Sequence, residues 1–312
     1  MNNKQKTKKI EADADYTDIT TGEVIKGEEL INRLEKIKTD KQKEKEEEVK
    51  EREKSKHYIT THLGNFYHFL YGGFFEMENK NEVVNKIKEY EANYFIRFLR
   101  LACEMDYDNG ILIDWRYNQD KKPLTKNQLV AILDISTKEW KYTIDYLKDK
   151  KLVTQEGKVY RVNINYIVKG DLSQKGNKAK EYGIIRVFLH GFKYLYDNLN
   201  NRERPSLFYI IQLLPYLNVD YNILCSNPLE DNINNIEPLT MDNIATILNL
   251  HIDTTRKKVK WFYSKSIAGV GVLAKIITNG KNALVLNPRL MYAGNKREKL
   301  ESIEKLMNND DW

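Results

Sequence analysis

Two stretches of this chain decide its fold, PLTKNQLVAILDISTKEWKYTIDYLKDKKLV at residues 123–153 and PLTMDNIATILNLHIDTTRKKVKWFYSKSIA at residues 238–268. They align without a gap at a constant offset of 115 residues. Their apolar positions coincide, so that Leu147 of the first stretch matches Phe262 of the second. A gapless match with shared apolar positions indicates an internal duplication of one structural unit.

Each stretch predicts two helices joined by a tight turn. The opening Pro-Leu-Thr places Thr125 and Thr240 where a helix N-cap is expected. A helix of about nine residues follows, and apolar residues recur in it at helical spacing. Three turn residues, 134–136 or 249–251, then lead into a longer helix. Two helices with such a turn are typical of a helix-turn-helix.

The segments around each helix pair complete a winged-helix pattern. A short strand is expected before each pair, and two strands with a Gly-containing turn, the wing, are expected after it. Asn279-Gly280 is a strong two-residue hairpin signal, and Glu156-Gly157 is a weaker one. Two apolar helices are expected to open each unit. The expected strands are Ile111–Asp114, Lys151–Thr154 and Lys158–Asn163 in the first copy, and Ile223–Ser226, Val270–Thr278 and Asn282–Asn287 in the second.

The likeness between the copies extends upstream, where residues 93–115 resemble 206–228 and FLYG at 69–72 resembles FLHG at 188–191.

The predicted fold class is mainly α with small β hairpins (α+β), as two tandem winged helix-turn-helix domains preceded by a long charged N-terminal helix. The expected divisions are a flexible N-terminal segment (1–27), the charged helix (28–56), winged-helix unit 1 (57–170), a linker (171–182), winged-helix unit 2 (183–296) and a C-terminal tail (297–312).

The N-terminal segments contain a predicted hairpin and a predicted long helix. Residues 18–27 favour a small hairpin around Thr21-Gly22. In the helix, Ile31, Leu34 and Ile37 form a short apolar stripe, and mixed charges follow it. Because the apolar spacing is not sustained, we expect a solvated connecting helix rather than a coiled coil.

Composition predicts a cytoplasmic protein, in the bacterial cytoplasm or nucleoid. No apolar run approaches the roughly 18 residues of a membrane span, and the opening MNNKQKTKKIEADADY lacks the apolar core of a secretory signal. Cys103 and Cys225 lie in apolar runs, as is typical of reduced, buried cysteines.

The formal charge of the chain is +6. Residues 1–56 are neutral, with 15 basic and 15 acidic side chains, so the excess of positive charge lies in residues 57–312. A positive balance suits a polyanionic partner without identifying one.

The second helix of the second copy, about Asp253–Ser264, is the stronger candidate for reading DNA. An α-helix fits the major groove of duplex DNA, and the second helix of this motif usually enters it. We expect Val259 and Phe262 to face the core, and Arg256 is the first candidate for a base contact because a guanidinium can fork onto guanine. A merely solvated charged face is the alternative. The candidate contacts are Thr254, Thr255, Arg256, Lys257, Lys258 and Lys260.

The first copy carries a weaker version of the same pattern. Glu139 and Asp145 dilute the charge of its second helix, so we expect the second copy to bind more tightly. We expect Trp140 to pack against neighbouring helices rather than stack on a base. The candidate contacts on this helix are Thr137, Lys138, Lys141, Tyr142 and Lys148. The candidate wing contacts, to phosphate or the minor groove, are Lys158, Arg161, Lys281 and Asn282, with isolated surface cations as the alternative.

Sequence signatures of catalysis are missing. The chain has no GxxxxGK[ST], HExxH, GxSxG, His-x-His or paired-cysteine motif, and its five histidines lack zinc-ligand spacing with its two cysteines. None of its 20 tyrosines is singled out as a nucleophile. We therefore expect no enzymatic activity, no metal and no cofactor.

The closing motif of each unit carries a family resemblance. LVLNPRLMYAGNK (284–296) and, more weakly, RVNINYIVKGD (161–171) follow the expected helix-turn-helix and wing. This order resembles RepL-type plasmid replication initiators and related phage-borne proteins. The resemblance implies a winged-helix protein that recognises an origin and recruits host replication proteins. The duplication and the charged N-terminal helix depart from that family. Another initiator class has two winged helices in tandem, but its motifs do not match here.

The sequence therefore predicts a sequence-specific double-stranded DNA-binding protein, a plasmid or phage replication initiator or an accessory of initiation. A transcriptional regulator on the same scaffold is one alternative, and a protein-interaction scaffold is another. The predicted partners are double-stranded DNA and host replication or transcription proteins. A homodimer is left open, and no membrane association is expected.

Overall fold

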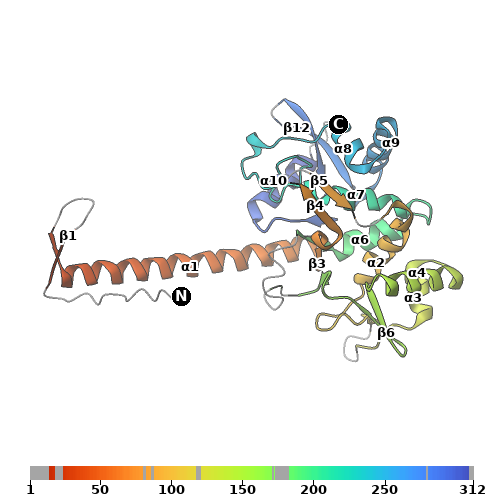
Figure 1. Ribbon diagram of the computed structural model, residues 1–312, viewed down its shortest axis with the longest axis horizontal. Coiled ribbons are helices and arrows are strands. Elements are labelled where there is room, and N and C mark those ends of the chain that lie inside the picture. The colour runs from red at the N-terminus through yellow and green to blue at the C-terminus, as the bar shows by residue number, and fades with distance from the viewer. Residues whose placement is uncertain are drawn as a thin grey trace. The chain divides into compact units, whose positions relative to one another are not determined.

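The computed structural model combines helices with small antiparallel sheets, and the fold class is therefore α+β (Figure 1). The chain divides into two compact units, Met1–His57 and Tyr58–Trp312. The structure describes residues 14–17, 24–79, 82–85, 88–116, 121–170, 172, 183–278 and 280–308.

The N-terminal unit contains a hairpin and most of a long helix. Strand β1 (Asp15–Thr17) pairs antiparallel with β2 (Val24–Lys26), which confirms a hairpin here, although the expected turn at 21–22 lies outside the described residues. Helix α1 (Gly27–Leu63) begins where the sequence predicts and continues beyond residue 56. Leu34 and Ile37 are exposed on it.

The last residues of α1, from Tyr58 onward, pack within the second unit against helix α10 (Arg297–Asn308). Ile59 and Leu63 share a buried cluster with Leu300, Ile303 and Met307 of that helix. Residues 297–312 were predicted to be a tail, but Leu300, Ile303 and Met307 recur at helical spacing and form an apolar stripe. The segment is therefore a packed helix as far as Asn308.

A four-stranded antiparallel sheet joins the two copies of the repeat, in the order β14-β9-β3-β8. The central strands pair so that Phe66 lies opposite Phe188, His68 opposite Arg186 and Leu70 opposite Ile184. The outer strands each follow the hairpin of one copy. The bounds are β3 (Phe66–Leu70), β8 (Ile167–Val168), β9 (Ile184–Phe188) and β14 (Met291–Tyr292).

Between its sheet strands, the first repeat (residues 57–170) contains one long apolar helix before its helix pair, not two. A 3-10 helix and a hairpin occupy the place of the other expected helix. The elements are η1 (Tyr71–Phe74), β4 (Phe75–Asn79), β5 (Glu82–Asn85), η2 (Glu89–Glu91), α2 (Ala92–Ala102), α3 (Lys126–Leu133), α4 (Thr137–Asp149), β6 (Val153–Glu156) and β7 (Val159–Val162).

The second repeat (residues 183–296) has both of the expected apolar helices, α6 and α7. Its hairpin β12–β13 is longer than β6–β7. The elements are α6 (Leu189–Asp197), η4 (Arg204–Leu207), α7 (Phe208–Leu213), η5 (Leu214–Tyr216), η6 (Ile233–Asn235), α8 (Met241–Leu248), α9 (Ile252–Tyr263), β10 (Ser266–Ile267), β11 (Val270–Gly271), β12 (Leu273–Thr278) and β13 (Lys281–Leu286).

Matching backbone hydrogen bonds show that the repeats share one architecture. The Leu112 amide donates to the Tyr160 carbonyl, and the Leu224 amide donates to the Leu284 carbonyl. These bonds add the short segment before each helix pair to its hairpin as a third strand, through single bridges such as Ile111 to Arg161. Leu112 therefore corresponds to Leu224, and residues of α2 and of the short segment around Leu112 in the first repeat correspond to residues 112 positions later in the second.

The same comparison corrects one part of the sequence alignment. The Leu70 amide donates to the Tyr166 carbonyl, and the Phe188 amide donates to the Leu290 carbonyl. Leu70 therefore corresponds to Phe188, which shifts the match of FLYG to FLHG by one residue. Neighbouring positions of an apolar strand are alike in sequence, so an alignment can be wrong by one residue. The backbone hydrogen bonds show which residues occupy equivalent positions.

Contacts between the repeats are extensive and include buried polar groups. Arg204, 4% exposed, donates from Nη1 to the Leu133 carbonyl at 2.9 Å and from Nη2 to Asp134 at 3.1 Å. Lys193 lies 2.8 Å from Glu104 in an ion pair. One apolar cluster runs through both repeats. Arg204 of the second repeat thus provides a hydrogen-bond donor for a carbonyl at the C-terminal end of α3 in the first repeat. The two repeats form one body.

Candidate nucleic-acid interface

The two helix pairs are set by matching local signals. Thr125 accepts a hydrogen bond from the Gln128 amide, and Thr240 accepts one from the Asn243 amide, which confirms both predicted N-caps. At the turns Asp134 and Asn249 each have φ of 51°, in the left-handed region that Asp and Asn tolerate better than most residues. Each pair therefore has the same local signals, a capped first helix and a left-handed residue in the turn that leads to the second helix.

On α9 the buried side consists of Thr255, Val259 and Phe262. The Thr255 hydroxyl donates to the His251 carbonyl at 3.2 Å. Thr255 was predicted to be among the DNA contacts, but the structure places it in the interior. Its spacing from Val259 and Phe262 is that of one helix face, so the signal was present in the sequence.

The exposed side of α9 is cationic. Arg256, Lys257 and Lys260 are exposed, as is Thr254. Arg256 Nη1 lies 3.1 Å from Asp253 Oδ1, with both side chains more than half exposed. Exposed pairs of this kind contribute little free energy, so this guanidinium can exchange Asp253 for a phosphate at small cost. Counting Lys258, helix α9 carries four cations against one carboxylate.

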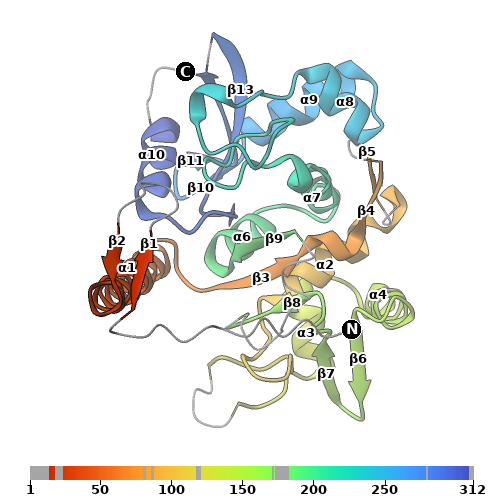
Figure 2. The ribbon, with the colours of Figure 1, turned by 60° about the vertical axis from the view of Figure 1, so that its left-hand side comes forward.

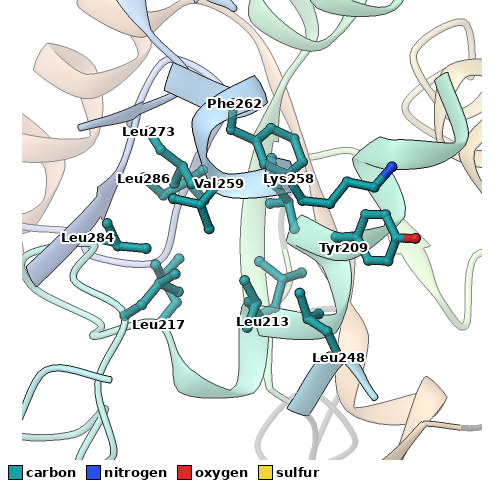
Figure 3. Close-up of a pocket in the computed structure, with 13 residues that line it drawn as sticks. Tyr209, Leu213, Leu217, Leu248, Lys258, Val259, Phe262, Leu273, Leu284 and Leu286 are labelled. Carbon is teal, nitrogen blue, oxygen red and sulfur yellow. The ribbon is translucent and has the colours of Figure 1, made fainter. Parts of the chain in front are cut away.

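Lys258 does not belong to this exposed surface. It is half-buried, donates from Nζ to Ser206 Oγ at 3.3 Å, and lies 5.0 Å from the centre of the Tyr209 ring. Figure 3 shows its ammonium directed toward Tyr209, at the edge of an apolar cavity between α7, α8, α9 and the hairpin β12–β13. Lys258 was predicted to contact DNA, but here it attaches α9 to α7.

On α4 the buried residues include Trp140, Thr143, Ile144 and Leu147. Trp140 is 2% exposed, and its ring packs edge-on against Tyr160, which confirms that it is a packing residue. The five predicted contacts are all exposed, namely Thr137, Lys138, Lys141, Tyr142 and Lys148. The three lysines of the helix are balanced by Glu139, Asp145 and Asp149. Helix α4 is therefore neutral where α9 is cationic.

A buried arginine that the sequence patterns did not single out holds α4 in place. Arg97 on α2, 3% exposed, donates to Thr143 Oγ1 at 2.8 Å and to Glu139 Oε1 at 3.1 Å. Hydrogen bonds from Ser136, with Arg97 nearby, lower the pKa of Glu139. By the correspondences above, Arg97 matches Tyr209 and Thr143 matches Lys258. The repeats therefore make the same helix-to-helix contact with the cation on opposite partners.

The hairpin of the second repeat exposes more of its predicted contacts than the hairpin of the first repeat. Lys158 is exposed beside the turn of β6–β7, but Arg161 is half-buried and lies 3.6 Å from Glu156 within that hairpin. On β12–β13 both predicted contacts, Lys281 and Asn282, are exposed. Asn279, in the predicted turn, lies outside the described residues.

Two further residues on β12–β13 belong to its exposed face. Lys275 is exposed, and Ile277, which is 68% exposed, lies directly opposite Asn282. The other face is supported by the preceding loop, where the Thr278 hydroxyl donates to the Ile233 carbonyl at 3.4 Å. Alternation along KIITNGKN is the sequence signal for this face.

Other site chemistries find no support in the described part of the chain. No cluster of three or more His, Cys, Asp or Glu side chains that could hold a metal occurs there. Among the same residues, every helix is too short or too polar to cross a bilayer. Cys103 and Cys225 are buried, and burial raises the pKa of each thiol to about 12.

No family model, curated protein or solved structure matches the chain.

Proposed function

We propose that this protein binds duplex DNA through two tandem winged-helix units, with α9 as the principal reading helix and α4 as the secondary one. The observation that carries the proposal is the contrast in charge between two helices of the same architecture. Helix α9 exposes Arg256, Lys257 and Lys260 beside a hairpin with Lys275 and Lys281, whereas the cations of α4 are balanced.

The physical argument combines shape with charge. A single α-helix fits the major groove of B-DNA, and a flanking hairpin reaches the adjacent phosphates or minor groove. Each cation that neutralises a phosphate releases a condensed counterion, so affinity falls steeply as salt rises. Arg256 can form a forked pair with guanine, and the exposed ammonium groups of Lys257 and Lys260 can pair with phosphates.

The process that this binding serves is proposed from the closing motif. Residues 284–296 resemble the end of RepL-type initiators, which favours initiation of plasmid or phage replication over transcriptional control. Selection of bound fragments from the source genome tests this choice. Enrichment of a replication origin supports an initiator, and enrichment of promoters supports a regulator.

DNA binding itself is tested with the triple variant Arg256→Ala, Lys257→Ala, Lys260→Ala, which removes three exposed cations and leaves Lys258 in place. We expect its affinity for a random-sequence duplex pool to fall. The slope of log affinity against log salt should become shallower by about 0.9 for each phosphate that the variant no longer neutralises. Fluorescence anisotropy at several salt concentrations measures both.

The matched control replaces Lys41, Lys43 and Lys45, three exposed lysines of the neutral helix α1, with alanine. This control should keep the affinity and the slope of the wild type. Unchanged binding by the α9 variant would contradict the assignment of the reading helix. Wild-type affinity without salt dependence would favour the protein-interaction scaffold.

A further inference from the structure

The four-stranded sheet has an internal two-fold symmetry. Strands β3 and β9 are equivalent in the two repeats, and so are β8 and β14. Replacing each strand by its equivalent gives the same order, β14-β9-β3-β8, read from the opposite edge of the sheet. By the register above, His68 corresponds to Arg186, and these two residues lie opposite each other at the centre of the β3–β9 pair. A two-fold axis therefore passes through the sheet at this residue pair.

The helical layer obeys the same symmetry. Helices α2 and α7 are equivalent, and they pack against each other across the centre, with the rings of Phe95 and Phe208 6.0 Å apart. Contact between equivalent helices at the centre is the arrangement expected if the axis that relates the central strands also relates the central helices.

Each reading helix is fixed to its own central helix by an equivalent contact. Arg97 of α2 donates to Thr143 of α4, and Tyr209 of α7 carries Lys258 of α9 over its ring. In Figure 2 the pairs α3–α4 and α8–α9 lie on the same side of the molecule, and the hairpins β6–β7 and β12–β13 extend toward opposite ends. The reading helices are therefore related by the axis and face one side together.

We infer that the DNA target of this chain is an inverted pair of half-sites, read on opposite strands by α9 and α4. This inference rests on the proposed function. A two-fold axis perpendicular to a duplex exchanges its strands, so two readers that it relates must meet inverted sequences. Repeats related by translation alone would instead read direct repeats.

The two half-sites are not identical, because the readers have diverged at their exposed positions. Arg256, Lys257 and Lys260 of α9 correspond to Lys141, Tyr142 and Asp145 of α4. The wild type should therefore select one well-defined half-site beside a degenerate one, and the inverted symmetry stays hidden in its target.

Making the two readers alike exposes the symmetry. The variant Lys141→Arg, Tyr142→Lys, Asp145→Lys gives α4 the exposed residues of α9 at three positions that are all on the surface. The probe is a pool of random-sequence duplexes, from which bound molecules are selected and sequenced. We expect the variant to enrich the strong half-site of the wild type twice, in inverted orientation and about 10 base pairs, or a multiple of this, between centres.

The outcomes separate the inference from the proposed function. Two copies in direct orientation, or a single copy, would overturn the inverted arrangement while leaving DNA binding intact. Failure of the wild type to bind the pool would overturn the proposed function, whereas binding that enriches no sequence would overturn the inference alone. If the triple variant does not fold, as judged by circular dichroism, the double variant Tyr142→Lys, Asp145→Lys takes its place with the same expectation.

Discussion

At the residue scale, the most informative contrast is between Lys257 and Lys258, neighbours with different roles. Lys257 is exposed on the proposed DNA surface, whereas Lys258 turns back toward Ser206 and Tyr209. The first can exchange solvent for phosphate, but the second already has partners and lies beside an apolar cavity. Charge alone would not distinguish them, because the phase of the helix decides which cation is available.

Replacing Lys258 with alanine should therefore destabilise the fold. The substitution removes a hydrogen bond to Ser206 and the packing of an aliphatic stem, and we expect the free energy of unfolding to fall by about 1–2 kcal/mol. Lys257→Ala is the matched control and should change it by less than about 0.5 kcal/mol. Urea denaturation measures both, and equal stability of the two variants would contradict the role given to Lys258.

Lys169 gives a prediction of pH dependence. It is 4% exposed, donates to the Met105 carbonyl at 2.9 Å and lies 4.0 Å from the Trp115 ring centre. Burial lowers its pKa from 10.5 to about 8. In the unfolded chain the ammonium keeps its proton to higher pH, so between these values the unfolded state binds more protons. This group therefore makes folding more favourable as pH rises from 8 toward 10.5.

The measurement is the free energy of unfolding of the wild type minus that of Lys169→Met across this range. The difference should rise with pH, by at most about 1.4 kcal/mol per unit. Cys225, whose pKa burial raises, gives the opposite slope in both proteins and cancels in the difference. The pKa of Cys103 is also raised by burial, but the Lys169 charge partly offsets this rise, so the thiol of Cys103 titrates differently in the variant and does not cancel completely. A difference independent of pH would show that Lys169 is not the source.

At the scale of elements, the helix pairs could be predicted and the long-range pairings could not. Thr125, Asp134 and Thr240 act on neighbours a few residues away, so their effect is visible in the sequence. The β3–β9 register joins residues more than a hundred positions apart, and no local signal encodes it. The inward turn of Thr255 was predictable from helix phase, whereas the buried contacts of Arg97 depend on packing between helices.

The hairpin β12–β13 gives a prediction about Ile277. An exposed apolar side chain at the end of a cationic hairpin is suited to insert between base steps in the minor groove. We expect Ile277→Thr to weaken duplex affinity several-fold without altering the melting temperature, since Thr retains β-propensity. Val24→Thr, at another exposed apolar position on a strand, is the control and should bind as the wild type does. Equal affinities of the two variants in a gel-shift assay would exclude this contact.

At the scale of the whole molecule, Arg204 tests whether the repeats are one body. Arg204→Ala removes buried hydrogen bonds to the Leu133 and Tyr196 carbonyls, although the Tyr196 hydroxyl still donates to Leu133. We expect it to lower the free energy of unfolding by about 3 kcal/mol. Arg202→Ala, on the adjacent exposed surface, should have little effect. Guanidinium titrations followed by tryptophan fluorescence compare them. Equal unfolding midpoints of the two variants would argue against a role for Arg204 in joining the repeats.

The sheet that joins the repeats has a consequence for their history. Strands β3 and β9 each complete their hydrogen bonding with the other repeat, so an ancestor with a single copy would have left that strand edge open. Such an ancestor would have needed a twin, as a homodimer built on the same axis. Fusion of two such partners by gene duplication would give the present chain. Once they were covalently joined, each half could mutate independently, which accounts for one helix that is rich in positive charge and another that is neutral.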